Sequence, residues 1–196
     1  MTDVRGQKMI GDPRVLRALA HPARLEIMEH LSATDASVTA TECAEIVGLS
    51  PSATSYHLRE LAKVGMVEQA PSRGDGRERV WRSAARSWGV DVAPDADAEL
   101  AAAEDSLIDT YLTWEFARLR DWMARARAEP KEWHDASVYS GSTLLVTAEE
   151  LRQLTAAVRD LLAPLKFRER ADAPPDGARK VSVTFAAYPA DRGVAA

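Results

Sequence analysis

Apolar residues recur at helical spacing in two short segments of the stretch 39–64, and a polar turn separates the segments. The apolar positions are Ala44, Ile46 and Val47 in the first segment, then Ala53, Leu58, Leu61 and Val64 in the second. The pattern predicts two short helices joined by a tight turn. The rest of the chain is interpreted around this pair.

Start and stop signals support both helices. Thr39 and Glu42 have the spacing of a capping box, which begins a helix. Gly48 stands where a left-handed residue would end that helix, and Ser50-Pro51 begins the next one. A helix, a glycine turn and a second helix that opens with hydroxyl residues are typical of a helix-turn-helix.

Two short extended runs follow the second helix and flank a turn-rich tip at 72–77. This pattern predicts a β-hairpin, in the place of the wing of a winged helix. Residues 50–86 contain seven Lys and Arg and four Asp and Glu residues, so the segment carries +3 in a chain whose net charge is −5. A local positive field of this kind favours phosphate binding.

Four pieces in order carry a family resemblance: 16–27, 48–50, 55–61 and 65–67. With them, residues 13–83 resemble the winged-helix domain of the ArsR family of bacterial transcriptional regulators. The resemblance covers somewhat over a third of the chain. It implies a homodimer on a palindromic operator, with repression as the default and activation left open.

The whole chain is predicted to be mainly α with a small β content (α+β), with three parts after a short N-terminal arm. Residues 1–11 are expected to be a flexible arm, 12–88 the winged helix-turn-helix domain, and His21 a boundary residue between its first two helices. Residues 89–130 are a linker and a long helix, about 98–128, that is apolar on more than one side and must be covered on more than one side. Residues 131–189 are a small α/β appendage: a strand at 137–146, a helix begun by the capping box of Thr147 and Glu150, and a strand at 181–186.

Candidate DNA contacts are polar residues of the second helix and cations of the hairpin, since hydroxyls and arginines reach base edges and phosphates. The candidates are Ser50, Ser52, Thr54, Ser55, His57 and Arg59 in the helix, with Arg73, Arg77 and Arg79 in the hairpin. For His57, packing and phosphate contact are both open. Two-fold symmetry would place two such helices in successive major grooves of double-stranded DNA, about 34–36 Å apart.

An aromatic group lies around the end of the long helix: Tyr111, Trp114, Phe116, Trp122 and Trp133. Two interpretations remain open. The rings can form the core that joins the helix to the appendage, or they can line an apolar pocket for a small organic effector.

The sequence gives little support for a metal site, a catalytic site or a membrane-spanning segment. The single cysteine, Cys43, fits core packing and a reducing compartment. Arsenic-sensing relatives have a Cys-x-Cys pair where this chain has Thr39 and Thr41, so no metal or cofactor is expected. No catalytic motif was found, which argues against an enzyme. A cytoplasmic protein is expected, because no apolar run approaches the length of a membrane span and no secretory signal is present. The alternative function is a winged helix that binds proteins without reading DNA.

Overall fold

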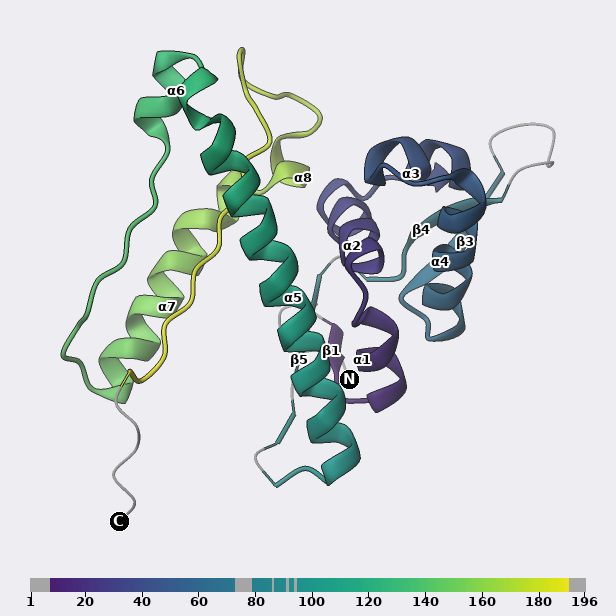
Figure 1. The fold of residues 1–196 in the computed structure, drawn as a ribbon, viewed down its shortest axis with the longest axis horizontal. Coiled ribbons are helices and arrows are strands. Elements are labelled where there is room, and N and C mark those ends of the chain that lie inside the picture. The colour runs from purple at the N-terminus through teal and green to yellow at the C-terminus, as the bar shows by residue number, and fades with distance from the viewer. Residues whose placement is uncertain (1–7, 73–78, 86, 91, 94, 191–196) are drawn as a thin grey trace. The chain divides into compact units, whose positions relative to one another are not determined.

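A computed structural model describes residues 8–72, 79–85, 87–90, 92–93 and 95–190 of the chain (Figure 1). The chain divides into two compact units, Met1–Ser137 and Val138–Ala196, and each is described by itself. The secondary structure is mainly helical with short strands, as the α+β prediction stated. No helix among the described residues is long and apolar enough to cross a membrane.

Four short helices build the first part of unit 1: α1 (Pro13–Leu19), α2 (Pro22–Thr34), α3 (Ala40–Val47) and α4 (Pro51–Lys63). The predicted capping box of α3 is confirmed, because Thr39 Oγ1 accepts from the Glu42 N–H at 3.1 Å and Glu42 Oε2 accepts from the Thr39 N–H at 2.7 Å. Gly48 ends α3 at φ 65°, a left-handed conformation that favours glycine. The helix–glycine–helix prediction for 39–64 is therefore confirmed.

The core of unit 1 lies among these helices. Its largest fully buried side chains come from α1, α2, α4 and the chain just after α4: Leu16, Leu19, Ile27, Met28, Leu31, Leu58, Leu61, Met66 and Val67. Within α1, α2 and α4 these positions follow helical spacing, so burial of one apolar face accounts for the packing of the helices.

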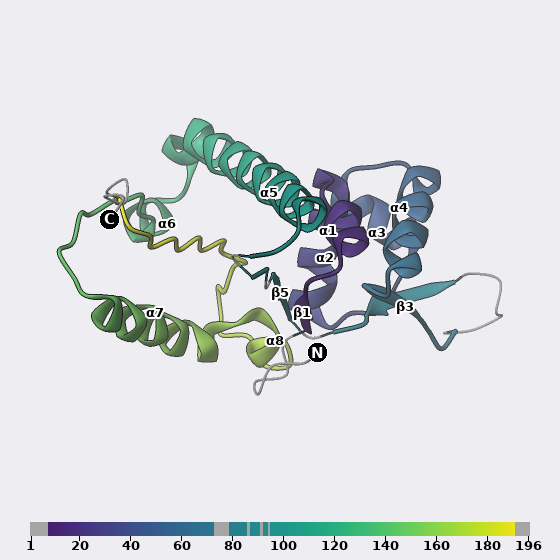
Figure 2. The same ribbon diagram turned by 90° about the horizontal axis from the view of Figure 1, so that it is seen from below.

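A small antiparallel sheet flanks α4 and has the strand order β2-β4-β3. Its strands are β2 (Val38–Thr39), β3 (Val67–Ala70) and β4 (Val80–Ser83). The β3–β4 pair is the predicted hairpin, with Ala70 opposite Val80, and β3 runs beside α4 (Figure 2). Residues 73–78 of the tip lie outside the described part of the chain. Strand β2 is too short to leave a period in the sequence, and it was not predicted.

A second, parallel pair joins β1 (Lys8–Ile10) to β5 (Trp88–Val90). The prediction of a flexible arm is therefore wrong for residues 8–10. Ile10 is buried, and Lys8 Nζ donates to the Gly65 carbonyl oxygen at 2.6 Å. Three residues cannot show an alternating pattern, and their partner strand lies far along the sequence, so local reasoning could not find the pair.

The long helix α5 (Ala98–Arg125) ends in a 3₁₀ turn, η1 (Ala126–Ala128), which confirms the predicted extent. It packs on α1 and α2 and buries Ala103 and Leu107. Two ion pairs join it to these helices, Arg17–Glu99 at 2.9 Å and Glu29–Arg118 at 2.8 Å. A short helix, α6 (Lys131–Ala136), follows.

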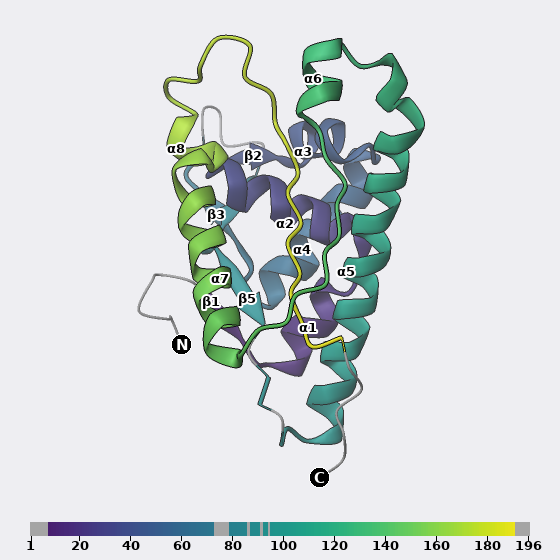
Figure 3. The same cartoon turned by 90° about the vertical axis from the view of Figure 1, so that its left-hand side faces the viewer.

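Unit 2 is organised around α7 (Ala148–Leu162), which is followed by η2 (Ala163–Leu165) and α8 (Phe167–Arg170) (Figure 3). The capping box that begins α7 is confirmed, with Glu150 Oε2 2.7 Å from the Thr147 nitrogen. The predicted strands at 137–146 and 181–186 are wrong, because neither segment is a strand in the structure. A strand requires a ladder of hydrogen bonds to a neighbour, and alternation in one segment does not supply that neighbour.

Candidate DNA-binding surface

The helix α4 presents two different faces. Thr54, Leu58 and Leu61 stand one turn apart and are fully buried against the core of unit 1. Ser52, Tyr56 and Arg59 lie on the other side and are exposed. Because one face is fixed in the core, the opposite face is rigidly presented to solvent, as a helix that enters a groove requires.

Thr54 was predicted to contact DNA, and the structure contradicts that prediction. Its side chain is 0% exposed, so no base or phosphate can reach it in this conformation. The reason is the spacing of the buried row: Thr54 stands four residues before Leu58, and its methyl group suits the core side of the helix. The remaining hydroxyls lie at or near the start of α4, where Ser50 caps the helix by accepting from the Ala53 N–H at 3.3 Å.

The exposed face carries one residue that was left out of the predicted contacts. Tyr56 is 53% exposed and stands between Ser55, which is half-buried, and the half-buried His57. Arg59 is exposed, and its Nε donates to the Ser55 carbonyl oxygen at 3.1 Å, which holds the guanidinium along the helix. An amphipathic ring beside hydroxyls was the available signal for Tyr56, and it could stack or hydrogen-bond at a groove.

Ion pairs reduce the number of cations that are available to DNA. Lys63 pairs with Glu60 at 2.6 Å, and Arg82 pairs with Glu68 across the hairpin at 2.6 Å. Arg79 is exposed immediately before β4. The predicted contacts Arg73 and Arg77 lie outside the described residues. The positive charge counted along the sequence is thus partly neutralised on the surface.

His57 lies at the edge of α4 that faces α2. Its ring centroid is 4.6 Å from that of His21 and 5.4 Å from that of Tyr56, and the Tyr56 and His57 rings form a T-shaped pair. Burial lowers the pKa of His57, and the nearby His21 and Arg24 lower it further, while Glu60 acts in the opposite direction. The ring contact with His21 supports the packing interpretation, and the residue as a whole is half-buried.

Cys43 is fully buried in α3, as the core-packing interpretation predicted. Burial raises the pKa of its thiol to about 11, and Glu26 adds to the effect. Within the described part of the chain, no three His, Cys, Asp or Glu side chains are grouped in a way that could hold a metal ion.

The aromatic group of α5 and α6 is only partly assembled. The ring centroids of Tyr111 and Trp114 are 5.9 Å apart, and Trp114 packs against the core. The guanidinium carbon of Arg118 lies 4.5 Å from the centroid of the Trp114 ring. Phe116 is 50% exposed. Tyr111 lines a recess of about 380 Å³. The other residues that line this recess were not among the predicted effector contacts: Trp88, Val90, Leu107, Ile108 and Leu112.

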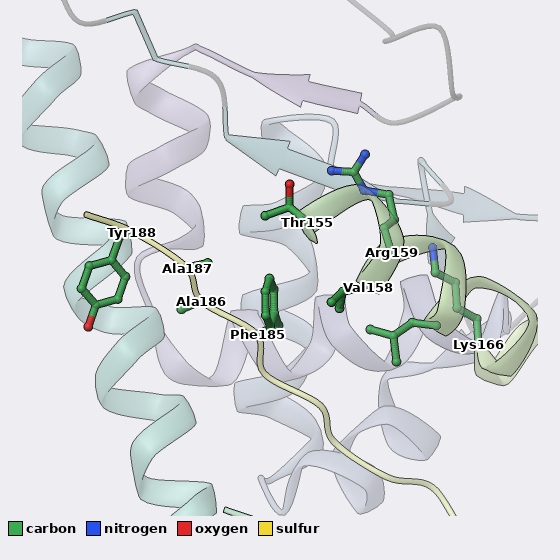
Figure 4. Close-up of a pocket in the computed structure, with 9 residues that line it drawn as sticks. Thr155, Val158, Arg159, Lys166, Phe185, Ala186, Ala187 and Tyr188 are labelled. Carbon is green, nitrogen blue, oxygen red and sulfur yellow. The ribbon is translucent and has the colours of Figure 1, made fainter. Parts of the chain in front are cut away.

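Unit 2 has an open recess of its own, of about 550 Å³ (Figure 4). One wall is the α7 face with Thr155, Val158 and Leu162, and the other is the extended segment 185–188. Phe185 and Val158 lie near each other in this recess. The end of the segment predicted as the last strand, at 185–186, therefore lines a recess with α7.

Comparison with known proteins agrees with the geometry of α2, α3 and α4. Residues 19–70 match the family model of a helix-turn-helix domain, a family that includes ArsR-type regulators. No curated protein matches the chain. The match ends within β3, so it does not extend to α5 or unit 2. The chain therefore contains a helix-turn-helix domain, the type of domain by which transcriptional regulators bind DNA.

Proposed function

We propose that this protein is a transcriptional regulator of the winged helix-turn-helix type, that it binds double-stranded DNA sequence-specifically, and that α4 is its recognition helix. The observation that carries the proposal is the division of α4 into a buried row and an exposed face with Ser52, Tyr56 and Arg59. The β3–β4 hairpin beside α4 supports a wing that holds the DNA backbone through Arg79. Arg73 and Arg77 belong to the same proposed wing.

The protein acts as a homodimer in this proposal, paired through α5. An apolar stripe runs along the side of α5 that does not pack on α1, and its members are between 45% and 52% exposed: Ile108, Leu112, Phe116 and Met123. An exposed apolar stripe of this size favours a partner surface. A two-fold axis beside α5 would present two α4 helices to two half-sites of a palindromic operator.

Repression by occupation of a promoter is the proposed outcome of binding, at DNA in the cytoplasm. A small organic effector would regulate it from the recess that Tyr111 lines, because that recess adjoins the α5 stripe. A ligand there that favours one pairing geometry would change the spacing of the two recognition helices.

Binding to random duplex DNA as a function of salt tests the proposal against a protein-binding winged helix. A DNA-binding protein should lose affinity steeply as salt rises, with a slope of about −0.9 for each phosphate contacted. Selection from a random duplex pool should then enrich a palindrome. Absence of duplex binding at low salt would reject DNA as the partner and favour the protein-interaction alternative.

A further inference from the structure

A polar cluster lies where the first turn of α2 meets α4, outside the face described above. His21 caps α2, because its Nδ1 accepts from the Ala23 N–H at 3.2 Å. That bond leaves Nε2 of a neutral ring as the protonated nitrogen and therefore as a donor. The His21 ring lies in a tilted contact with the ring of His57 of α4, with centroids 4.6 Å apart and an interplanar angle of 43°.

Arg24 completes the cluster from the same turn of α2. Its electrostatic effect is felt at His21, at His57 and at Glu60, which places it near all three. The Nε atom of Arg24 and the Nδ1 atom of His57 are both closed to solvent and have no hydrogen-bond partner. Buried polar atoms are nearly always paired, so the polar groups of this cluster are not fully satisfied within the protein, and its outer N–H groups are the ones that a ligand from solvent can reach.

The balance of charge shows which kind of acceptor fits. Glu60 is the acidic side chain that acts on His57, and it is already paired with Lys63. Other charged side chains on the elements packed against α4 are engaged elsewhere or do not act on the ring: Arg14 with Asp12, Arg17 with Glu99, Glu26, whose charge acts on Cys43, Glu29 with Arg118, Glu42 in the α3 cap, Glu45, and Glu68 with Arg82. An arginine and two imidazoles with one neutralised carboxylate attract an anion.

The position of the cluster indicates where that anion comes from. His57 lies next to the exposed Tyr56 on α4, and the rings of His21 and His57 and the Arg24 side chain are each partly open to solvent. A backbone phosphate would lie beside a helix inserted in the major groove.

We propose that Arg24, His21 and His57 form a phosphate-binding position for duplex DNA on the α2 flank of the recognition helix. This inference rests on the proposed function. The sequence indicated only a boundary residue at His21, and it gave no role to Arg24. On binding, the outer N–H groups of Arg24, the Nε2–H of neutral His21 and the protonated imidazole of His57 donate to phosphate oxygens, so DNA binding takes up a proton at His57.

The test measures affinity for a random 20-base-pair duplex by fluorescence anisotropy, as a function of salt and of pH between 5.5 and 7.5. Arg24→Gln should lower the salt slope by about 1, while Arg120→Gln, which removes an exposed cation of α5, should leave it unchanged. The wild type should bind more tightly as pH falls, by up to about tenfold per unit for each proton taken up. His57→Gln should flatten that dependence.

A structural role alone would lower the melting temperature of these variants without changing the salt slope or the pH profile. For this reason the imidazole C–H signals of the wild type are also followed by NMR during titration with duplex and, separately, with inorganic phosphate at equal ionic strength. Shifts of the His21 and His57 signals with duplex and not with phosphate are expected. Equal shifts with inorganic phosphate would overturn the assignment to DNA.

Two further outcomes separate this proposal from the proposed function. In the first, the wild type binds duplex, but Arg24→Gln leaves the salt slope unchanged and His57→Gln leaves the pH profile unchanged. This result would overturn the phosphate position and leave the DNA-binding function standing. Absence of wild-type duplex binding would overturn both.

Discussion

Replacing Leu112 by glutamate tests the pairing of subunits through α5. Leu112 is 45% exposed, and Ile108 and Phe116 beside it are 45% and 50% exposed. Full burial of such a side chain stabilises by about 1.5–3 kcal/mol, so covering the exposed half in a dimer contributes about 1 kcal/mol for each residue. In a two-fold dimer the substitution removes that contribution in both subunits.

The glutamate also places two carboxylates near the symmetry axis, and their repulsion and desolvation add about 1–2 kcal/mol at a partly solvated interface. The total of about 3–4 kcal/mol corresponds to a dimer Kd that is roughly a hundred to a thousand times weaker. Sedimentation velocity over a concentration series measures the constant directly.

Ala117→Glu is the matched control, because Ala117 is exposed on α5 but lies away from the stripe of Ile108, Leu112 and Phe116. It adds the same charge and keeps a good helix former, so its dimer constant should equal that of the wild type. Equal constants for the Leu112 and Ala117 variants, with both folded by circular dichroism, would show that α5 does not pair the subunits.

Three further predictions concern unit 1. Arg79→Ala should weaken binding to all duplexes alike and lower the salt slope by about 1, as measured by fluorescence anisotropy. Weaker binding to one duplex sequence alone would mean that the wing reads bases or groove shape. Cys43 should react with iodoacetamide at pH 8 on the order of a hundred times more slowly in the folded than in the unfolded protein, because burial raises its pKa to about 11; equal rates, followed by mass spectrometry, would contradict its burial. The pKa of His57 is lowered in the folded state, so the unfolded chain binds its proton first and the melting temperature should fall as pH drops below about 6.5; calorimetry of His57→Gln should show a smaller fall, and identical curves would remove His57 from the effect.

Helix boundaries were accessible from the sequence because their signals are local. Thr39 with Glu42, Gly48, and Thr147 with Glu150 each act within four residues, and all appear in the structure as predicted. The two-sided long helix was also predictable, since its apolar pattern continues over many turns.

Strand pairing was accessible only where a turn joins the partners. The β3–β4 hairpin followed from its tip, whereas β1–β5 joins residues 8–10 to residues 88–90. The reverse error occurred at 181–186, where alternation indicated a strand and the neighbouring 185–188 segment instead lines a recess with α7. Alternation reports which side of a chain is apolar and does not identify what covers it.

Within the candidate site, residue type identified the candidate contacts on α4, and the side of the helix on which each residue lies was predicted less well. Ser52 and Arg59 lie on the exposed side of α4, while Thr54 belongs to the buried row and Tyr56 was overlooked. A shift of one or two positions on a helix moves a side chain by 100–200° around the axis. The side of α4 on which each residue lies could therefore be determined only from the packing of α4 on its neighbours.

Equilibrium binding of wild type and Arg59→Ala to the duplex obtained by selection is the most direct test of α4 as the recognition helix. Arg59 is exposed, and its Nε donates to the Ser55 carbonyl oxygen of its own helix, so alanine should leave the fold and melting temperature unchanged. The account predicts a loss of about 1–3 kcal/mol, a five- to roughly hundredfold weaker Kd for the selected duplex, with a smaller loss for random duplex. Equal affinity of the two proteins for the selected duplex would contradict the account.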